Sequence, residues 1–144
     1  MRIRDILRRK GDTVTTVRPE APVRDLLATL ARHNIGAAVV SPDGATIVGI
    51  VSERDVVRRL HEHGAGLLDR PVADIMTAEV RTCTPDAAVA ELRRTMTEHR
   101  IRHLPVVRDG RLAGIVSIGD VVKSAIDELE SEREYLVGYI QRAP

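Results

Sequence analysis

Aromatic residues are almost absent from this sequence, which holds two tyrosines and no phenylalanine or tryptophan. The core must therefore be aliphatic, built from valine, isoleucine, leucine and alanine. The one cysteine, Cys83, excludes an internal disulfide bond. No apolar run approaches the ~20 residues of a membrane-spanning helix, and the first residues lack the apolar stretch of a secretory signal. These absences favour a cytoplasmic protein that does not enter a membrane.

A strong charge of one sign is also missing. The 22 basic and 21 acidic residues leave a net charge of +1, which gives no electrostatic footprint for nucleic acid. We find no Ser-His-Asp context and no pair of carboxylates with a reason to differ in pKa. His61 and His63 supply two metal ligands, fewer than a site needs. We therefore expect no enzyme, and assign no catalytic residue, no metal ligand and no required cofactor.

Most of the sequence consists of two copies of one internal repeat. The paired segments are Val14–Pro19 with Val80–Pro85, Gly49–Ser52 with Gly114–Ser117, and the lead-in Asp5–Leu7 with Asp74–Met76. Because the correspondence runs through a whole repeat, chance is a poor explanation for it.

Each copy predicts the same order of elements. A short β-branched run, at 14–17 and at 80–84, predicts a strand that a proline ends. Apolar residues at helical spacing follow at 23–30 and 89–96. Two strands joined by a turn containing Asp-Gly come next, and a serine can cap the closing helix. The unit is β-α-β-β-α, of the α/β (α+β) class. Two copies should pack about a pseudo-two-fold axis and bury the apolar sheet faces between them.

These patterns divide the chain into four parts. Residues 1–63 form the first repeat, 64–71 a linker, 72–126 the second repeat and 127–144 a C-terminal helical extension. The glycine-bearing start of the linker lacks the context of a phosphate loop and is expected to be flexible. In the extension, Leu129, Leu136 and Ile140 fit either a core or a dimer seam. Residues 121–140 hold more apolar positions than one core needs, so we expect a homodimer.

The motifs in these repeats resemble those of the CBS domain family, whose tandem pairs are called Bateman modules. The motifs are Gly49-Ile50-Val51-Ser52-Glu53-Arg54-Asp55, Gly114-Ile115-Val116-Ser117-Ile118-Gly119-Asp120 and Ile101-Arg102-His103-Leu104-Pro105-Val106-Val107. The resemblance reaches about Ile126, and the chain is similar to stand-alone bacterial CBS-pair proteins. It implies a sensor of an adenosine-containing ligand (AMP, ADP, ATP, NAD or S-adenosylmethionine) that signals to a downstream protein, which the sequence does not identify.

The serine and aspartate of each motif have a chemistry that suits such a ligand. A helix that begins after Ser52 presents free N–H groups and a partial positive charge, which favour a phosphate. Asp55 lies one turn in, and a carboxylate matches the two donor hydroxyls of a ribose. Ser117 and Asp120 repeat this arrangement. The same spacing also fits a capping box, in which the acid bonds to the backbone of its own cap.

One feature breaks the symmetry of the repeats. Arg102 and His103 stand where the first copy has Gly36 and Ala37. In the family this position contacts phosphates, and a basic pair near the cleft between the copies suits that role; two solvated side chains on an edge strand are the alternative. The predicted nucleotide-binding residues are Thr16, Ser52, Arg54, Asp55, Thr82, Arg102, His103, Ser117 and Asp120.

The sequence thus favours a module that binds AMP, ATP or NAD in the cleft between two repeats. The alternative is a nucleotide-free scaffold for dimerisation, protein interaction or redox sensing. For Cys83 the simplest role is to fill volume beside a strand, and it could also line the adenine pocket.

Overall fold

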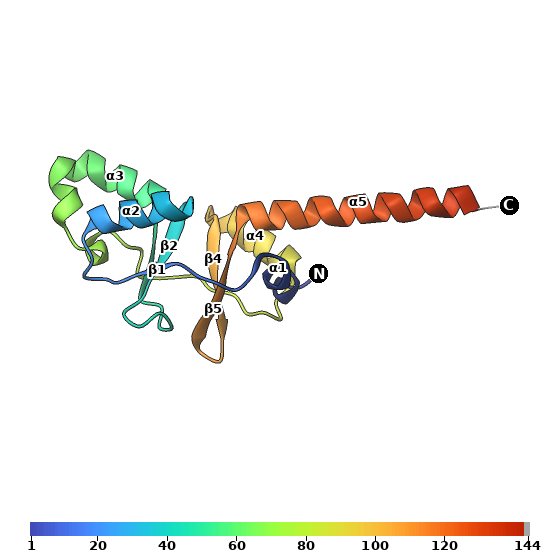
Figure 1. The fold of residues 1–144 in the computed structure, drawn as a ribbon, viewed down its shortest axis with the longest axis horizontal. Helices are drawn as coiled ribbons and strands as arrows, with labels where there is room; N and C mark the ends of the chain where they lie inside the picture. The colour runs from blue at the N-terminus through green and yellow to red at the C-terminus, as the bar shows by residue number, and fades with distance from the viewer. Residues whose placement is uncertain (143–144) are drawn as a thin grey trace.

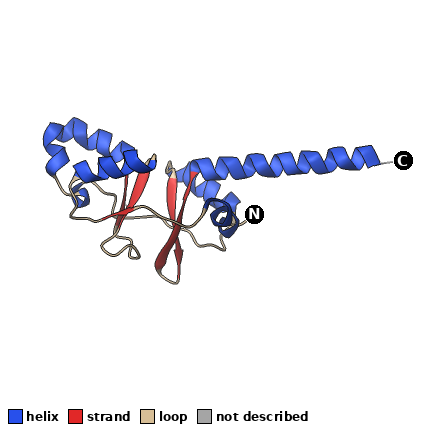
Figure 2. Cartoon of the chain, in the orientation of Figure 1, coloured by secondary structure: helices blue, strands red, loops and turns tan. Residues whose placement is uncertain are grey.

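The computed structural model describes residues 1–142, in which two small sheets stand at the centre with helices around them (Figures 1 and 2). The first repeat comprises α1 (Ile3–Lys10), β1 (Thr16–Val17), α2 (Val23–His33), β2 (Ala37–Val40), β3 (Gly49–Ser52) and α3 (Glu53–His63). The second comprises α4 (Val89–His99), β4 (His103–Arg108), β5 (Arg111–Ser117) and α5 (Ile118–Arg142). The predicted mixed fold with a C-terminal helix is confirmed.

The first strand of each copy is shorter than predicted. In the first sheet, β1 pairs in parallel with β2 over two residues, and β2 pairs antiparallel with β3. In the second, β4 and β5 pair antiparallel, and only Cys83 takes the place of the first strand, by a parallel bridge to Val106. Cys83 donates its N–H to the Pro105 carbonyl and accepts from the Val107 N–H. The rest of the predicted run at 80–84 makes no ladder, so its β-branched residues overstate the strand.

The strand connections differ between the copies. Asp109 and Gly110 both have positive φ, of 52° and 76°, which makes the β4–β5 connection a tight turn whose twist suits a hairpin. In the first copy, the expected turn at Asp43-Gly44 lies within a longer connection. Residues 41–48 form a longer loop there, and the Asp43 carboxylate holds it by accepting the N–H groups of Ala45 and Thr46 at 2.9 and 2.7 Å.

Each repeat sends its lead-in segment to the other repeat. The N–H of Ile3 donates to the carbonyl of Ala87 at 3.0 Å, and the N–H of Val72 donates to the carbonyl of Ala21 at 2.8 Å. The same reciprocity holds for three further pairs of contacts: Arg4 with Pro85 and Ala73 with Pro19; Val89 with Met1 and Val23 with Arg70; and the bridges Arg2–Ala88 and Pro71–Pro22. This reciprocity is the signature of a two-fold relation between the repeats.

Side chains of the exchanged segments complete two separate cores. Ile3, Ile6 and Leu7 of α1 belong to the cluster built around the second sheet. Val72 and Ile75 belong to the cluster built around the first sheet. One face of each sheet is therefore covered by the repeat's own helices and the exchanged lead-in. Ala37 and Val39, on the opposite face of β2, are buried as well and belong to neither cluster.

Two glycines make room for this exchange. A side chain at Gly114 would meet the methyl groups of Leu7 at 2.8 Å, and one at Gly49 would collide with the thioether of Met76. Leu7 and Met76 are equivalent in the two lead-ins, and Gly114 and Gly49 are equivalent in the two sheets. Close approach of a lead-in side chain to the sheet explains why both motifs begin with glycine.

The segment predicted as a flexible linker is ordered and contributes to a core. Residues Gly64–Asp69 form a 3-10 helix, η1, and a second one, η2, spans Val72–Asp74. Leu67 is fully buried in the first core. The chain between the repeats is therefore part of the first repeat's packing.

The last helix leaves the body of the protein. Only the start of α5 buries side chains, at Val121 and Ser124, and its second half runs well past the rest of the chain (Figure 1). Among residues 1–142, no helix combines the length and the apolar character needed to cross a membrane. Leu129, Leu136 and Ile140 are exposed, so they are not core residues.

The exchange predicts that an N-terminal residue stabilises the second repeat. Ile3 is completely buried, so Ile3→Ala should lower the free energy of unfolding by about 2–4 kcal/mol through lost burial and a residual cavity. The measurement is chemical denaturation followed by circular dichroism. Val57→Ala is the matched control, because Val57 is 67% exposed and its truncation should cost less than about 0.5 kcal/mol. Equal stability of the Ile3 variant and wild type would refute the docking of α1.

Candidate functional site

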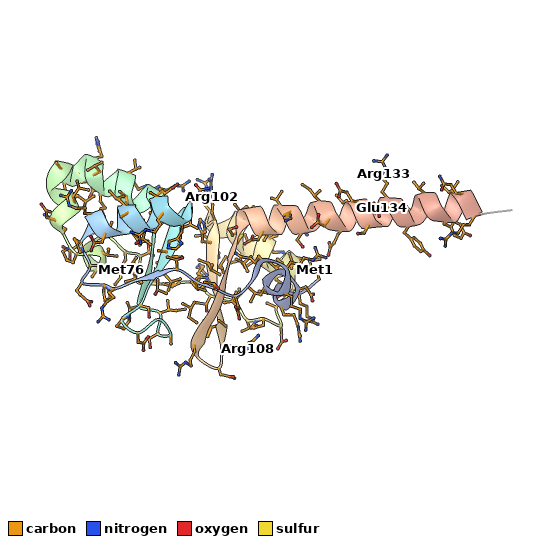
Figure 3. The ribbon with its side chains drawn as sticks, in the orientation of Figure 1. Met1, Met76, Arg102, Arg108, Arg133 and Glu134 are labelled. Carbon is orange, nitrogen blue, oxygen red and sulfur yellow. The ribbon has the colours of Figure 1, made fainter. Side chains whose placement is uncertain are left out.

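A cavity of about 860 Å³ lies between the repeats and is lined by both. Its walls include the start of α3 with Ser52, and the start of α5 with Ser117, Ile118 and Gly119. Two helix N-termini therefore face one cavity, and each carries a partial positive charge that favours an anion. In the side-chain view, Arg102 lies at the junction of the two halves, where β4 begins (Figure 3).

Asp55 caps its own helix and lines the cavity at the same time. Its Oδ2 accepts the Ser52 N–H at 2.8 Å and the Ser52 hydroxyl at 3.0 Å, and its own N–H donates to Ser52 Oγ at 3.3 Å. This is the capping box that the spacing allowed. Both bonds to the carboxylate end on Oδ2, so Oδ1 retains its capacity to accept from a ligand.

Asp120 makes the same cap, with one added partner. Its Oδ2 accepts the Ser117 N–H at 2.8 Å, and its own N–H donates to Ser117 Oγ at 3.2 Å. The Lys10 ammonium donates to the same Oδ2 at 2.7 Å. Partial burial works to raise the pKa of Asp120, but the hydrogen bonds from Lys10 and Ser117 outweigh it and hold that pKa below its ordinary value.

The cavity between the repeats is basic, although the whole chain is nearly neutral. Five arginines and three acidic residues line it: Arg54, Arg58, Arg81, Arg100 and Arg102, with Glu53, Asp55 and Glu79. Among residues 1–142, the arginines in ion pairs are Arg4, Arg8, Arg9, Arg18, Arg24 and Arg59. None of the five cavity arginines is among them, so their charges are available to an anionic ligand.

His103 is half-buried at the start of β4 and also faces this cavity. Burial lowers the pKa of His103 below its ordinary value, and the nearby positive charge of Lys10 adds to the effect. The negative charges of Asp120 and Glu53 act in the opposite direction. The imidazole is therefore neutral at neutral pH, and a bound phosphate would favour its charged form.

The structure brings together six of the nine predicted nucleotide-binding residues. Ser52, Arg54, Asp55, Arg102, His103 and Ser117 line the cavity. Asp120 lines a different cavity of about 450 Å³ between α1 and α5. Thr16, in β1, and Thr82, which is exposed, line neither of these two cavities. Roles in ligand binding stay predictions for all nine residues.

Sequence reasoning missed three of the cavity arginines and Glu79. Arg58 could have been found, because it follows Arg54 at helical spacing and so shares its face of α3. Arg100 ends α4 in the left-handed conformation, with φ of 53°, and nothing in the sequence predicted where its side chain would lie. Arg81 and Glu79 belong to the exchanged segment, whose path across to the first repeat was not foreseen.

Cys83 does not line the cavity between the repeats. Burial raises the pKa of its thiol to about 11, so the reactive thiolate is scarce at neutral pH. This argues against the redox alternative. Among the described residues, no group of three His, Cys, Asp or Glu side chains converges as a metal site would require.

Comparison with known proteins identifies both repeats. The family model for the CBS domain matches residues 3–62 and again residues 72–127. A CBS domain-containing mitochondrial protein, CBSX3 of Arabidopsis thaliana, is 37% identical, over 96% of this chain and 71% of its own length. The CBS domain-containing protein YhcV of Bacillus subtilis is 29% identical, over 83% of this chain and 81% of its own.

Solved structures agree with this assignment. A CBS-domain containing protein from Agrobacterium tumefaciens superposes with a TM-score of 0.83 at 42% identity, over 86% of this chain and 92% of its own. The CBS domain pair of protein MJ0100, solved in complex with 5'-methylthioadenosine and S-adenosyl-L-methionine, gives a TM-score of 0.76 at 25% identity. It covers 85% of this chain and 98% of its own.

Proposed function

This chain belongs to the CBS domain family as a tandem pair, and from that premise we propose that it is a regulatory module that binds an adenosine nucleotide. The ligand occupies the cavity between the repeats, and its presence is signalled to a protein partner. The observation that carries the proposal is the basic, unpaired lining of that cavity beside the Ser52–Asp55 cap.

Each part of an adenosine nucleotide has a complementary group in the cavity. Oδ1 of Asp55 can accept a ribose hydroxyl while Oδ2 keeps the helix capped. The small residues Gly36 and Ala37, with Ile50, offer a slot for a flat base. The arginines and the two helix N-termini suit phosphates.

The charge of the cavity favours some adenosine ligands over others. The pair from MJ0100 holds methylthioadenosine, which lacks a phosphate, and S-adenosylmethionine, which carries a positive sulfonium. Five unpaired arginines would repel that sulfonium and attract phosphates. We therefore propose that the ligand of this chain is AMP, ATP or NAD. The cavity presents no activated nucleophile and no metal constellation among the described residues, which supports binding rather than catalysis.

Helix α5 offers a physical route for the signal. Ser117, Ile118 and Gly119, at its beginning, line the cavity. An apolar stripe runs along the exposed side of the helix from near its beginning to near its end: Val122, Ile126, Leu129, Leu136 and Ile140, all between 49% and 72% exposed. A ligand that shifts the first turn of a continuous helix also moves the stripe along its length.

The occupant we propose for this stripe is a second copy of the chain. Its residues are separated by four, three, seven and four positions, which fits a coiled-coil seam. Arg133 stands at the seam position within the interval of seven, between Leu129 and Leu136. Glu130 and Glu132 border that position, so a second copy can neutralise the arginine. Most of a helix's stability in proteins comes from packing of its apolar face, which the projecting part of α5 lacks in the single chain. In the resulting homodimer, the paired α5 helices connect two sensor modules.

Arg102 should bind the phosphate of the nucleotide. Arg102→Ala should weaken AMP binding roughly 10- to 150-fold, the equivalent of about 1.5–3 kcal/mol for a charge-assisted bond. Adenosine affinity should change little, because the ribose and base contacts remain. As pH falls from about 8 to 6, the preference for AMP over adenosine should grow, since bound phosphate favours protonated His103. Calorimetry of both ligands makes the comparison.

Arg108→Ala is the matched control. Arg108 lies at the other end of the same strand, in the β4–β5 hairpin (Figure 3), and does not line the cavity. The Arg108→Ala variant should bind AMP with the affinity of the wild type. Equal losses of AMP and adenosine affinity in the Arg102 variant would mean that Arg102 supports the pocket rather than the phosphate.

The apolar stripe of α5 should determine whether the protein is a monomer or a dimer. Leu129→Lys places a charge within the apolar stripe and should convert the dimer to a monomer in sedimentation experiments at micromolar concentration. Ser131→Lys adds the same charge on the opposite face of the helix, where it lines the α1–α5 cavity, and should remain dimeric. A wild-type monomer, or a dimer that survives Leu129→Lys, would contradict the proposal.

A further inference from the structure

The exchanged lead-ins bring opposite charges to the two Ser-x-x-Asp motifs. Counting from the matched segments Asp5–Leu7 and Asp74–Met76, Lys10 of the first lead-in corresponds to Glu79 of the second. Lys10 contacts the Asp120 carboxylate, whereas Glu79 lines the cavity that holds Asp55. The two motifs are therefore alike in sequence and unlike in surroundings.

The Lys10 ammonium is held by two acceptors. It donates to Oδ2 of Asp120 at 2.7 Å and to the carbonyl of Ile115 at 2.8 Å. Lys10 and Asp120 are both mostly shielded from solvent, with side-chain exposures of 31% and 22%. Such a pair is screened less than an ordinary surface ion pair.

The backbone around Lys10 fixes where its side chain can reach. Helix α1 is anchored on the second core by Ile3, Ile6 and Leu7. Gly11 then ends the helix with φ of 94° and returns its N–H to the Leu7 carbonyl at 2.8 Å. That positive φ turns the chain away directly after Lys10, which keeps the lysine in the last turn beside Asp120.

The Lys10 ammonium bonds to Oδ2 of Asp120, which the cap also uses, so Oδ1 has no protein partner among the described residues, as at Asp55. The ammonium opposes ribose binding through its charge. A hydroxyl bond to a carboxylate that an ammonium already neutralises is weaker than one to a free carboxylate, and the ammonium is tethered beside Asp120 at a high effective concentration. At Asp55, by contrast, no ion pair occupies the carboxylate among residues 1–142.

We propose that Lys10 is a built-in occupant of the second ribose position, so that each chain binds a single nucleotide, at the Asp55 motif. This inference rests on the function proposed above. It assigns Lys10 a role in the selectivity of the module: the duplicated motif is used once for ligand and once for an internal cation. Removal of that cation should expose Asp120 as a second acceptor.

The test counts nucleotides bound per chain, with ATP as the probe in calorimetry of the full chain. Wild type should bind one ATP. Lys10→Met keeps the length of the side chain and removes its charge, so this variant should bind a second ATP. Adding Asp120→Asn to the Lys10→Met variant should abolish binding of the second ATP and leave binding of the first unchanged. Arg8→Met is the matched control, since Arg8 lies on the same helix and pairs with Asp5 instead; it should bind one ATP.

Each outcome separates this inference from the proposed function. Two ATP molecules bound to wild type, or a single one still bound to Lys10→Met, would overturn the role of Lys10 and leave the nucleotide function standing. ATP binding that appears only in Lys10→Met would support Lys10 as the occupant and refute the Asp55 site. No binding to either protein would overturn both proposals.

A ligand-free measurement checks the position of Lys10 independently. His103 faces Lys10, Asp120, Glu53 and Arg102, and the positive charge of Lys10 helps to lower its pKa. In NMR titration, Lys10→Met should therefore shift the His103 transition to higher pH, and Arg8→Met should leave it unchanged. An unmoved transition in Lys10→Met would show that the ammonium does not lie beside Asp120.

Discussion

The reciprocal exchange of lead-in segments is the constraint on which this structure depends. Residues 1–4 make backbone hydrogen bonds to the region from Pro85 to Val89, and residues 70–73 make the equivalent bonds to the region from Pro19 to Val23. Neither core is complete without the other repeat's apolar side chains, because Ile3 and Ile6 belong to one cluster and Val72 and Ile75 to the other. The two repeats therefore depend on each other for their cores, and the exchange sets which residues meet at the cavity between them.

The same exchange makes a symmetric scaffold chemically asymmetric. It carries Lys10 to one aspartate, and it carries Glu79 and Arg81 to the cavity of the other. Arg102 adds positive charge directly before β4, where the first repeat has Gly36. A duplicated fold can thus keep its two-fold packing while its two ligand positions diverge, since only a few side chains at the ends of strands and helices need to differ.

Much of this could be predicted from the sequence because repetition and periodicity are local signals. The helices at 23–33 and 89–99, the Asp109–Gly110 turn and the serine caps all follow from patterns a few residues long. The exchange could not be predicted in this way, because Ile3 and Val72 read as apolar residues without indicating which sheet they cover. Arg81 and the Lys10–Asp120 pair depend on that path, and Arg100 depends on the left-handed end of α4, so their places needed the structure.

The most direct test of the account is a crystal structure of the chain grown with ATP. The account predicts ATP in the cavity between the repeats, with its ribose hydroxyls on Asp55 and its phosphates beside Arg102 and the starts of α3 and α5. A cavity that stays empty at saturating ATP, or a nucleotide bound elsewhere on the protein, would contradict it.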